Sequence, residues 1–324
     1  MGRYGRAPAG FAEWGEPVSD NGDNAASADR LRRYATYASV SVASTLIAAK
    51  LGAYLLTESV SILSSLIDSC TDLMASVVTL LGVRHALRPA DANHRFGHGK
   101  AEALAALAQA AFIGGSAVLL SIEAVRRLVR PEPIAEGTMG IAVMLLSILL
   151  TAGLITFQRR VQTATGSVAI GADRLHYSGD LLMNGAVIVA ILLTEATGLT
   201  VVDPLFGIGI ALFLLNGARG VARDALDVLM DRELAEEERG RIAELALAEP
   251  GVRGLHDLRT RNAGTGCFIE LHLELDGGLT LTAAHEIADR VETRLRDAFA
   301  NAEVLVHQEP AGLVDERLDH RIAG

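Results

Sequence analysis

The 324-residue sequence has few cysteines, few aromatic residues and no excess of positive charge. Its two cysteines, Cys70 and Cys267, lie in parts of the chain with different composition, which argues against an intramolecular disulfide. Residues 223–324 hold 12 basic and 22 acidic residues and carry the whole formal charge of −10. This acidity argues against nucleic-acid binding and suits a cationic partner. Residues 1–28 contain no basic segment followed by an apolar one, so we expect no signal peptide there.

Long apolar segments fill the first two thirds of the chain. Half of all residues are hydrophobic and the mean hydropathy is +0.31, which is too apolar for an ordinary soluble domain of this length. Six segments have the roughly 17–25 residues needed to cross a hydrocarbon core of about 30 Å. We therefore expect an α-helical membrane protein with six transmembrane helices, near Arg33–Leu56, Ser61–Leu87, Ala101–Val125, Gly137–Gln158, His176–Thr194 and Val202–Ala218.

The acidic C-terminal third contains no apolar segment of this length and is expected to form a separate α/β domain. Residues 267–275 alternate apolar and polar side chains, as in a half-buried strand. The predicted order is αββαβ, with helices at 234–248 and 282–299 and strands at 255–261, 267–275 and 302–307. The predicted divisions are a disordered tail at 1–28, a transmembrane domain at 29–222, a metal-binding domain at 223–311 and a tail at 312–324.

Basic residues near the span ends predict the orientation. With the N-terminus inside, most of them lie on the cytoplasmic side and only Arg126, Arg127 and Arg130 lie outside. The sequence therefore favours an inner-membrane protein with both termini in the cytoplasm. The residues on the cytoplasmic side are Arg30, Arg32, Arg33, Arg84, Arg88, Arg95, Lys100, Arg159, Arg160, Arg174, Arg219 and Arg223.

Two pairs of ionisable residues lie within apolar spans. Asp68 and Asp72 occur in the second span, and His176 and Asp180 open the fifth. Each pair is spaced i, i+4 and so projects from one face of its helix. Charged groups at this depth cost a few kcal/mol or more and are usually functional. Three carboxylates and one imidazole on neighbouring helices predict a four-ligand site for a divalent transition metal.

Two further sets of residues are candidate metal ligands. The loop after the second span holds Asp91, His94 and His98; it would bind a second metal or simply form a polar interfacial loop. The predicted strands of the C-terminal domain can bring three histidines and a carboxylate to one edge of a sheet, as in a zinc site; scattered surface histidines are the alternative. Those residues are His256, His272, His307 and Glu309.

The ordered set of these motifs resembles the cation diffusion facilitators, in particular their bacterial ferrous-iron/zinc efflux branch. The resemblance covers residues 30–311 and rests on the two i, i+4 pairs, on residues 93–102 (NHRFGHGKAE) and on residues 256–261 (HDLRTR). It implies a homodimer that exports Zn²⁺, with Cd²⁺ as a further substrate, in exchange for protons. It also implies that His285 joins the C-terminal site, where the family has Asp in place of Glu309, and that Lys100 and Asp231 form an ion pair between protomers.

The residues support proton coupling independently, because metal binding requires a neutral imidazole and ionised carboxylates. They leave Fe²⁺ or Mn²⁺ export open as an alternative, since carboxylates are hard ligands. A membrane metalloenzyme or a metal sensor is a weaker alternative. The enzyme would need a motif such as His-Glu-x-x-His, whose second histidine is absent after His285-Glu286. A sensor would not need ligands inside the membrane. We therefore expect a secondary transporter rather than an enzyme.

Overall fold

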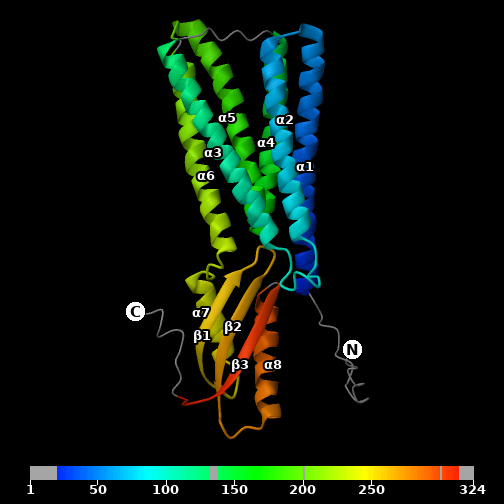
Figure 1. The fold of residues 1–324 in the computed structure, drawn as a ribbon, viewed down its shortest axis with the longest axis vertical. Helices are drawn as coiled ribbons and strands as arrows, with labels where there is room; N and C mark the ends of the chain where they lie inside the picture. Colours follow the sequence, from blue (N-terminus) through cyan, green and yellow to red (C-terminus); the bar gives the residue numbers. More distant parts are fainter. Residues whose placement is uncertain (1–19, 131–137, 200, 300, 314–324) are drawn as a thin grey trace.

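The computed structural model describes residues 20–130, 138–199, 201–299 and 301–313. A bundle of long helices is joined end to end to a small α/β domain (Figure 1). Within the described residues, six helices are long and apolar enough to cross a membrane, which confirms the six expected spans. They are α1 (Asp20–Thr57), α2 (Val60–Ala86), α3 (Lys100–Val129), α4 (Thr138–Thr165), α5 (Val168–Thr197) and α6 (Val202–Leu229).

Two of these helices begin earlier than the hydropathy pattern predicts. Helix α1 starts at Asp20, inside the segment expected to be a disordered tail, because a helix outside the membrane needs no apolar run. Helix α5 starts at Val168, so His176 lies about two turns inside it rather than at its beginning. Polar residues in its first turns lower the local hydropathy, so the apolar segment begins later in the sequence than the helix does. The rest of the two predicted tails, 1–19 and 314–324, lies outside the described residues.

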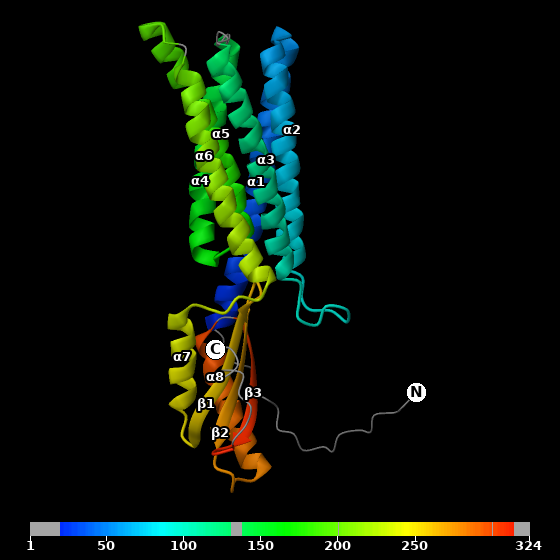
Figure 2. The ribbon, with the colours of Figure 1, turned by 60° about the vertical axis from the view of Figure 1, so that its left-hand side comes forward.

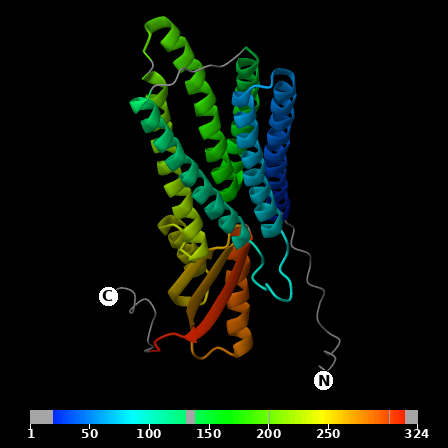
Figure 3. The same cartoon turned by 45° about the horizontal axis from the view of Figure 1, so that its top comes forward.

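The membrane helices pack through small residues. Helix α3 makes its most extensive contact with α6, and α1 packs against α2 and α4. At the crossing of α2 and α3, a Cβ on Gly82 would lie only 2.3 Å from the Cβ of Ala105, so the crossing requires glycine. At the end farthest from the C-terminal domain, α3, α5 and α6 diverge from α1 and α2 (Figures 1 and 3).

The C-terminal domain has two layers and the predicted αββαβ order. Its elements are α7 (Glu236–Leu247), β1 (Val252–Asn262), β2 (Cys267–Leu275), α8 (Leu281–Ala298) and β3 (Ala302–Pro310). The sheet order is β1-β2-β3, with β1 antiparallel and β3 parallel to β2. Both helices pack on one face of the sheet, where Ile242, Leu271 and Val291 belong to one apolar core.

The opposite face of the sheet carries the polar residues of the alternating strand. His256 on β1 pairs with His272 on β2, and His272 pairs with His307 on β3. Three histidines therefore form one row across the sheet, on neighbouring strands. Because strands lie about 4.8 Å apart, side chains in such a row are close enough to share a ligand.

The loop between α2 and α3 connects the helix bundle to the C-terminal domain. A Cβ on Gly99 would lie 1.9 Å from the carbonyl oxygen of Ala263, so the loop and the β1–β2 hairpin approach closely only because residue 99 is glycine. The Arg261 guanidinium lies 5.2 Å from the ring centre of Phe96 and 4.5 Å from that of Phe268. Figure 2 shows this junction at the lower end of the bundle.

Candidate metal centres

The first centre lies where α2 faces α5. Potential ligand atoms of Asp72, His176 and Asp180 all lie within 4.8 Å of one another. His176 Nε2 is 3.2 Å from Asp72 Oδ1 and 3.8 Å from Asp180 Oδ2. This nitrogen is buried and has no hydrogen-bond partner among the described residues, which leaves it available to a metal ion. One imidazole and two carboxylates form a donor set that suits a divalent transition metal.

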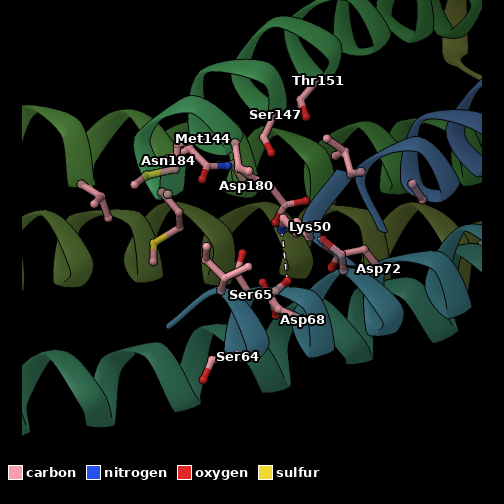
Figure 4. Close-up of a pocket in the computed structure, with 18 of the residues that line it drawn as sticks. Lys50, Ser64, Ser65, Asp68, Asp72, Met144, Ser147, Thr151, Asp180 and Asn184 are labelled. Carbon is pink, nitrogen blue, oxygen red and sulfur yellow. Dashed lines mark hydrogen bonds between the residues drawn. The ribbon is translucent and has the colours of Figure 1, made fainter. Parts of the chain in front are cut away.

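Asp68, the fourth residue of the predicted set, is not part of this cluster. It lies on α2 one turn before Asp72 and is exposed. Its side chain lines the same cavity as Asp72 and Asp180 (Figure 4). The structure therefore places Asp68 on the path to the centre rather than among its closest ligand atoms.

The cavity above this centre connects it to one end of the helix bundle. Its walls include Asp72 and Asp180 of the centre. They also include Arg127 on α3 and Gly140 on α4, which lie at the ends of these helices farthest from the C-terminal domain. Polar side chains also line the cavity near the centre, among them Ser147 on α4 and Asn184 on α5 (Figure 4). An ion at the centre would therefore have a route toward this far end.

Toward the C-terminal domain, a buried polar layer closes the bundle. The hydroxyl groups of Ser76 and Tyr177 lie 2.7 Å apart. Asp173, which is 1% exposed, accepts hydrogen bonds from Gln109 on α3 (3.2 Å), from Gln158 on α4 (2.7 Å) and from the Ser39 hydroxyl on α1. These contacts join five helices, α1 to α5, on the side of the centre opposite the cavity.

Two ionisable residues of this region are absent from the sequence-based site. Lys50 on α1 is 8% exposed and lines the cavity, and Asp173 organises the polar layer. Lys50 could have been identified from the sequence as a candidate functional residue, because it is the only charged residue between Arg33 and Glu58, in an apolar span. Asp173 was not, because residues 168–175 lay outside the expected span.

The loop before α3 forms the second candidate centre. Ligand atoms of Asp91, His94 and His98 lie within 4.8 Å of one another. Asp91 Oδ1 is 3.3 Å from His94 Nδ1, and Asp91 Oδ2 is 3.3 Å from His98 Nε2. The backbone N–H groups of His94 and Asn93 hydrogen-bond to Asp91 and lower the pKa of its carboxyl. His85, which the sequence analysis missed, meets His98 edge to face, with ring centres 4.8 Å apart and ring planes at 78°.

The third centre lies on the polar face of the sheet in the C-terminal domain. Ligand atoms of His256, His272 and Glu309 lie within 4.8 Å of one another. Glu309 is 2.8 Å from His272 Nδ1 and 3.2 Å from His256 Nε2, and it also lies 3.3 Å from His307 Nε2. The other ring nitrogen of the buried His256, Nδ1, lies 3.2 Å from Glu274 Oε1. The donor set therefore fits a zinc-like ion.

His285 does not join this centre within one chain. It lies on α8, which packs on the opposite face of the sheet, and its ring pairs with Asp289 at 3.6 Å. The imidazole is 65% exposed. The structure thus brings together three of the four histidines that the resemblance implies, with Glu309 between them.

Comparisons with known proteins identify the two domains. The model of the cation efflux transmembrane domain matches residues 36–230, and the model of the cytoplasmic domain of cation efflux proteins matches residues 234–311. The chain is 46% identical to the cation-efflux pump FieF of Klebsiella pneumoniae subsp. pneumoniae over 285 residues, which cover 88% of this chain and 95% of that one. It is also 46% identical to FieF of Shewanella oneidensis over 278 residues, 86% of this chain and 94% of that one.

A solved structure, the metal-bound C-terminal domain of the CzcD transporter from Thermotoga maritima, covers 25% of this chain and all of its own length. Its identity to this chain is 29% and its TM-score is 0.24. The two family matches together span the membrane helices and the sheet domain, and the FieF relatives match over nearly their whole length. The chain is therefore a cation efflux transporter that belongs to the cation diffusion facilitator family.

Proposed function

We propose that this chain exports divalent transition-metal cations, principally Zn²⁺, from the cytoplasm in exchange for protons. The observation that carries the proposal is the cluster of Asp72, His176 and Asp180 at the base of a cavity inside the membrane helices. Ionisable side chains at this depth are retained where an ion pathway needs them. Cd²⁺ is a further substrate because it is, like Zn²⁺, a divalent d¹⁰ ion with no geometric preference from its d electrons.

The donor chemistry supports proton exchange. A metal ion binds neutral imidazole and ionised carboxylates, so loading releases the protons that these groups hold in the empty site. His176 is the natural proton carrier, since imidazole changes charge near neutral pH. Its Nε2 faces both Asp72 and Asp180, so the same three side chains would hold either the metal ion or the protons.

The proposed orientation places the C-terminal domain and both termini in the cytoplasm of an inner-membrane protein. The excess of basic residues near that end of the helices supports it. The cavity would then open toward the outside, in the state from which metal leaves. The match to a cytoplasmic domain of cation efflux proteins supports the same orientation, and we further propose that the chain acts as a homodimer.

Fe²⁺ and Mn²⁺ are the alternative substrates. Two of the three ligands at the membrane centre, Asp72 and Asp180, are carboxylates. Carboxylates are hard ligands, so this site favours harder metal ions than a site made mostly of histidines would. We propose Zn²⁺ first because one ligand is an imidazole and because the C-terminal centre combines three imidazoles with one carboxylate.

Metal flux in sealed proteoliposomes tests the proposal. The purified chain is reconstituted, a pH gradient is imposed and Zn²⁺, Cd²⁺, Mn²⁺ and Fe²⁺ uptake is measured. We expect Zn²⁺ flux that stops when the pH gradient is removed. Asp180→Ala is expected to abolish this flux while the protein stays folded. Flux of Zn²⁺ at the parental rate in Asp180→Ala would show that the centre is not the transport site.

A further inference from the structure

Lys50 is a cation in the wall of the transport cavity that the metal-binding chemistry does not explain. It lies in an otherwise uncharged stretch of α1 and is 8% exposed. A buried ammonium in a membrane helix is costly unless other charges stabilise it. Its position therefore indicates an electrostatic role.

The contacts of Lys50 leave its charge directed at the transport site. Its Nζ donates hydrogen bonds to two neutral oxygens of α2, the Ser65 carbonyl at 3.1 Å and the Ser69 hydroxyl at 2.6 Å. These bonds hold the ammonium beside the face of α2 that carries Asp68 and Asp72. Figure 4 shows Lys50, from α1, beside these side chains and Asp180 of α5.

Three carboxylates line the same cavity as Lys50: Asp72, Asp68 and Asp180. The other basic residue of the cavity wall, Arg127, is held by acidic partners of its own. Its guanidinium donates to Glu123 at 2.9 Å and to Asp203 at 3.1 Å. Among the described residues that line the cavity, Lys50 is therefore the basic side chain whose hydrogen bonds go to neutral oxygens.

We propose that Lys50 is a positioning residue that sets the charge of the transport site to the value that a divalent ion neutralises. Three ionised carboxylates and one ammonium carry a net charge of 2−, and a divalent cation brings the loaded site to zero. A net charge in a low-dielectric site is costly, so this balance favours divalent cargo. The ammonium also repels the bound ion, which keeps affinity low enough for release. This inference rests on the transport function proposed above and concerns the same site.

The alternative role for Lys50 is purely structural, since its two hydrogen bonds join α1 to α2. Three variants separate the two roles. Lys50→Gln removes the charge and keeps an amide that can donate to α2. Lys50→Arg keeps the charge. Ser69→Ala removes one hydrogen bond and leaves the charge in place.

The experiment measures KM and Vmax for Zn²⁺ uptake into proteoliposomes at fixed pH, using full-length chains that elute as folded protein. Loss of the repelling charge in Lys50→Gln is expected to lower KM at least about fivefold and to lower Vmax, because release slows. Lys50→Arg and Ser69→Ala are expected to keep KM within about twofold of the parent, since both retain the positive charge.

A parental or raised KM in Lys50→Gln would overturn the inference. So would a KM in Ser69→Ala or in Lys50→Arg that matches Lys50→Gln, because the effect would then follow helix packing rather than charge. A parental chain without Zn²⁺ flux would overturn the transport function together with this inference. Normal parental flux with an unaltered Lys50→Gln variant would overturn the inference alone.

Discussion

Lys100 at the start of α3 and Asp231 just after α6 form an ion pair in which Nζ lies 2.8 Å from Oδ1. The second oxygen of Asp231 lies 3.5 Å from the guanidinium of Arg261 on β1. Asp231 thus joins two membrane helices to the sheet domain at the point where the chain leaves the bundle. The resemblance implied a Lys100–Asp231 pair between protomers, and the structure forms this pair within one chain.

We expect the Asp231 contacts to make a pH-dependent contribution to stability. Partial burial disfavours the ionised carboxylate, but the hydrogen bond and charge of Lys100, with Arg261, outweigh it and hold the pKa of Asp231 below its ordinary value of 3.8. A pKa that is lower in the folded state gives a contribution that is complete above the unfolded pKa and is lost as pH falls through the folded pKa. The contribution should be at most about 1 kcal/mol, because both side chains are partly exposed.

Thermal unfolding of the parent and of Asp231→Asn in detergent checks this expectation. The difference in Tm should be constant from pH 7 to about pH 5 and should shrink below about pH 4. Asp227→Asn is the matched control, since Asp227 pairs with Arg232 and not with the sheet domain. A difference that grows on acidification would contradict the assignment.

The different positions of Asp68 and Asp72 predict unequal effects on transport. Asp72→Ala should abolish Zn²⁺ flux, because Asp72 belongs to the cluster of closest ligand atoms. Asp68→Ala should leave measurable flux with a raised KM, because Asp68 lines the cavity without joining that cluster. Initial rates of uptake at several Zn²⁺ concentrations distinguish the two. Complete loss of flux in Asp68→Ala would return this residue to the ligand set.

Most of the fold could be predicted because it follows from apolar length and from strand alternation. Both signals are local: six spans need about 20 apolar residues each, and residues 267–275 alternate along one strand. Helix ends outside the membrane were harder to predict, because they depend on capping contacts rather than on apolar length. Helix α5, for example, starts where the Ser167 hydroxyl accepts a hydrogen bond from the Ile170 N–H at 3.2 Å. Close packing was also harder to place. A glycine in a membrane helix does not by itself mark a close crossing: a Cβ on Gly207 would lie 3.1 Å from the Cβ of Ala124, whereas a Cβ on Gly114 or Gly115 would meet nothing within 4 Å.

Residue type and periodicity were enough to predict which residues are candidate ligands, but not how their side chains are arranged in space. The i, i+4 spacing places Asp68 and Asp72 on the same face of α2, but it cannot say which one faces His176 across the gap to α5. The side chains of Lys50 and Asp173 acquire their partners from other helices, so their surroundings depend on the three-dimensional packing. His285 shows the same limit, since its distance from Glu309 depends on which face of the sheet α8 covers.

The C-terminal centre should depend more on Glu309 than on His285. Glu309 contacts three imidazoles, whereas His285 pairs with Asp289 on the other face of the domain. We therefore expect Glu309→Ala to weaken Zn²⁺ binding by the full-length chain more than His285→Ala does, by roughly 10-fold or more. Calorimetric titration in a background that carries both Asp180→Ala and His94→Ala, which disable the membrane centre and the loop centre, isolates this binding. Equal losses in both variants would mean that His285 reaches the same ion, for example from a second copy of the chain.

The buried carboxyl of Asp173 should be one of the main contributors to the stability of the helix bundle. It accepts hydrogen bonds from α1, α3 and α4. Asp173→Ala would therefore leave the Gln109 amide without its acceptor in a buried layer and would leave Gln158 with the Ser39 hydroxyl alone, at 3.0 Å. Leaving such donors unpaired costs about 1–3 kcal/mol each. We expect a clear fall in Tm in detergent for Asp173→Ala, with a smaller fall for Ser39→Ala, which removes one donor and leaves the two amide bonds in place.

Asp173→Asn provides the matched test of this explanation. The Gln158 carbonyl oxygen is buried without a partner among the described residues, so its amide can invert and accept a hydrogen bond from an asparagine at position 173. Asp173→Asn should therefore unfold at a temperature between those of the parent and Asp173→Ala. If Asp173→Asn were as unstable as Asp173→Ala, the ionic charge of the carboxyl rather than its hydrogen bonds would hold the layer together.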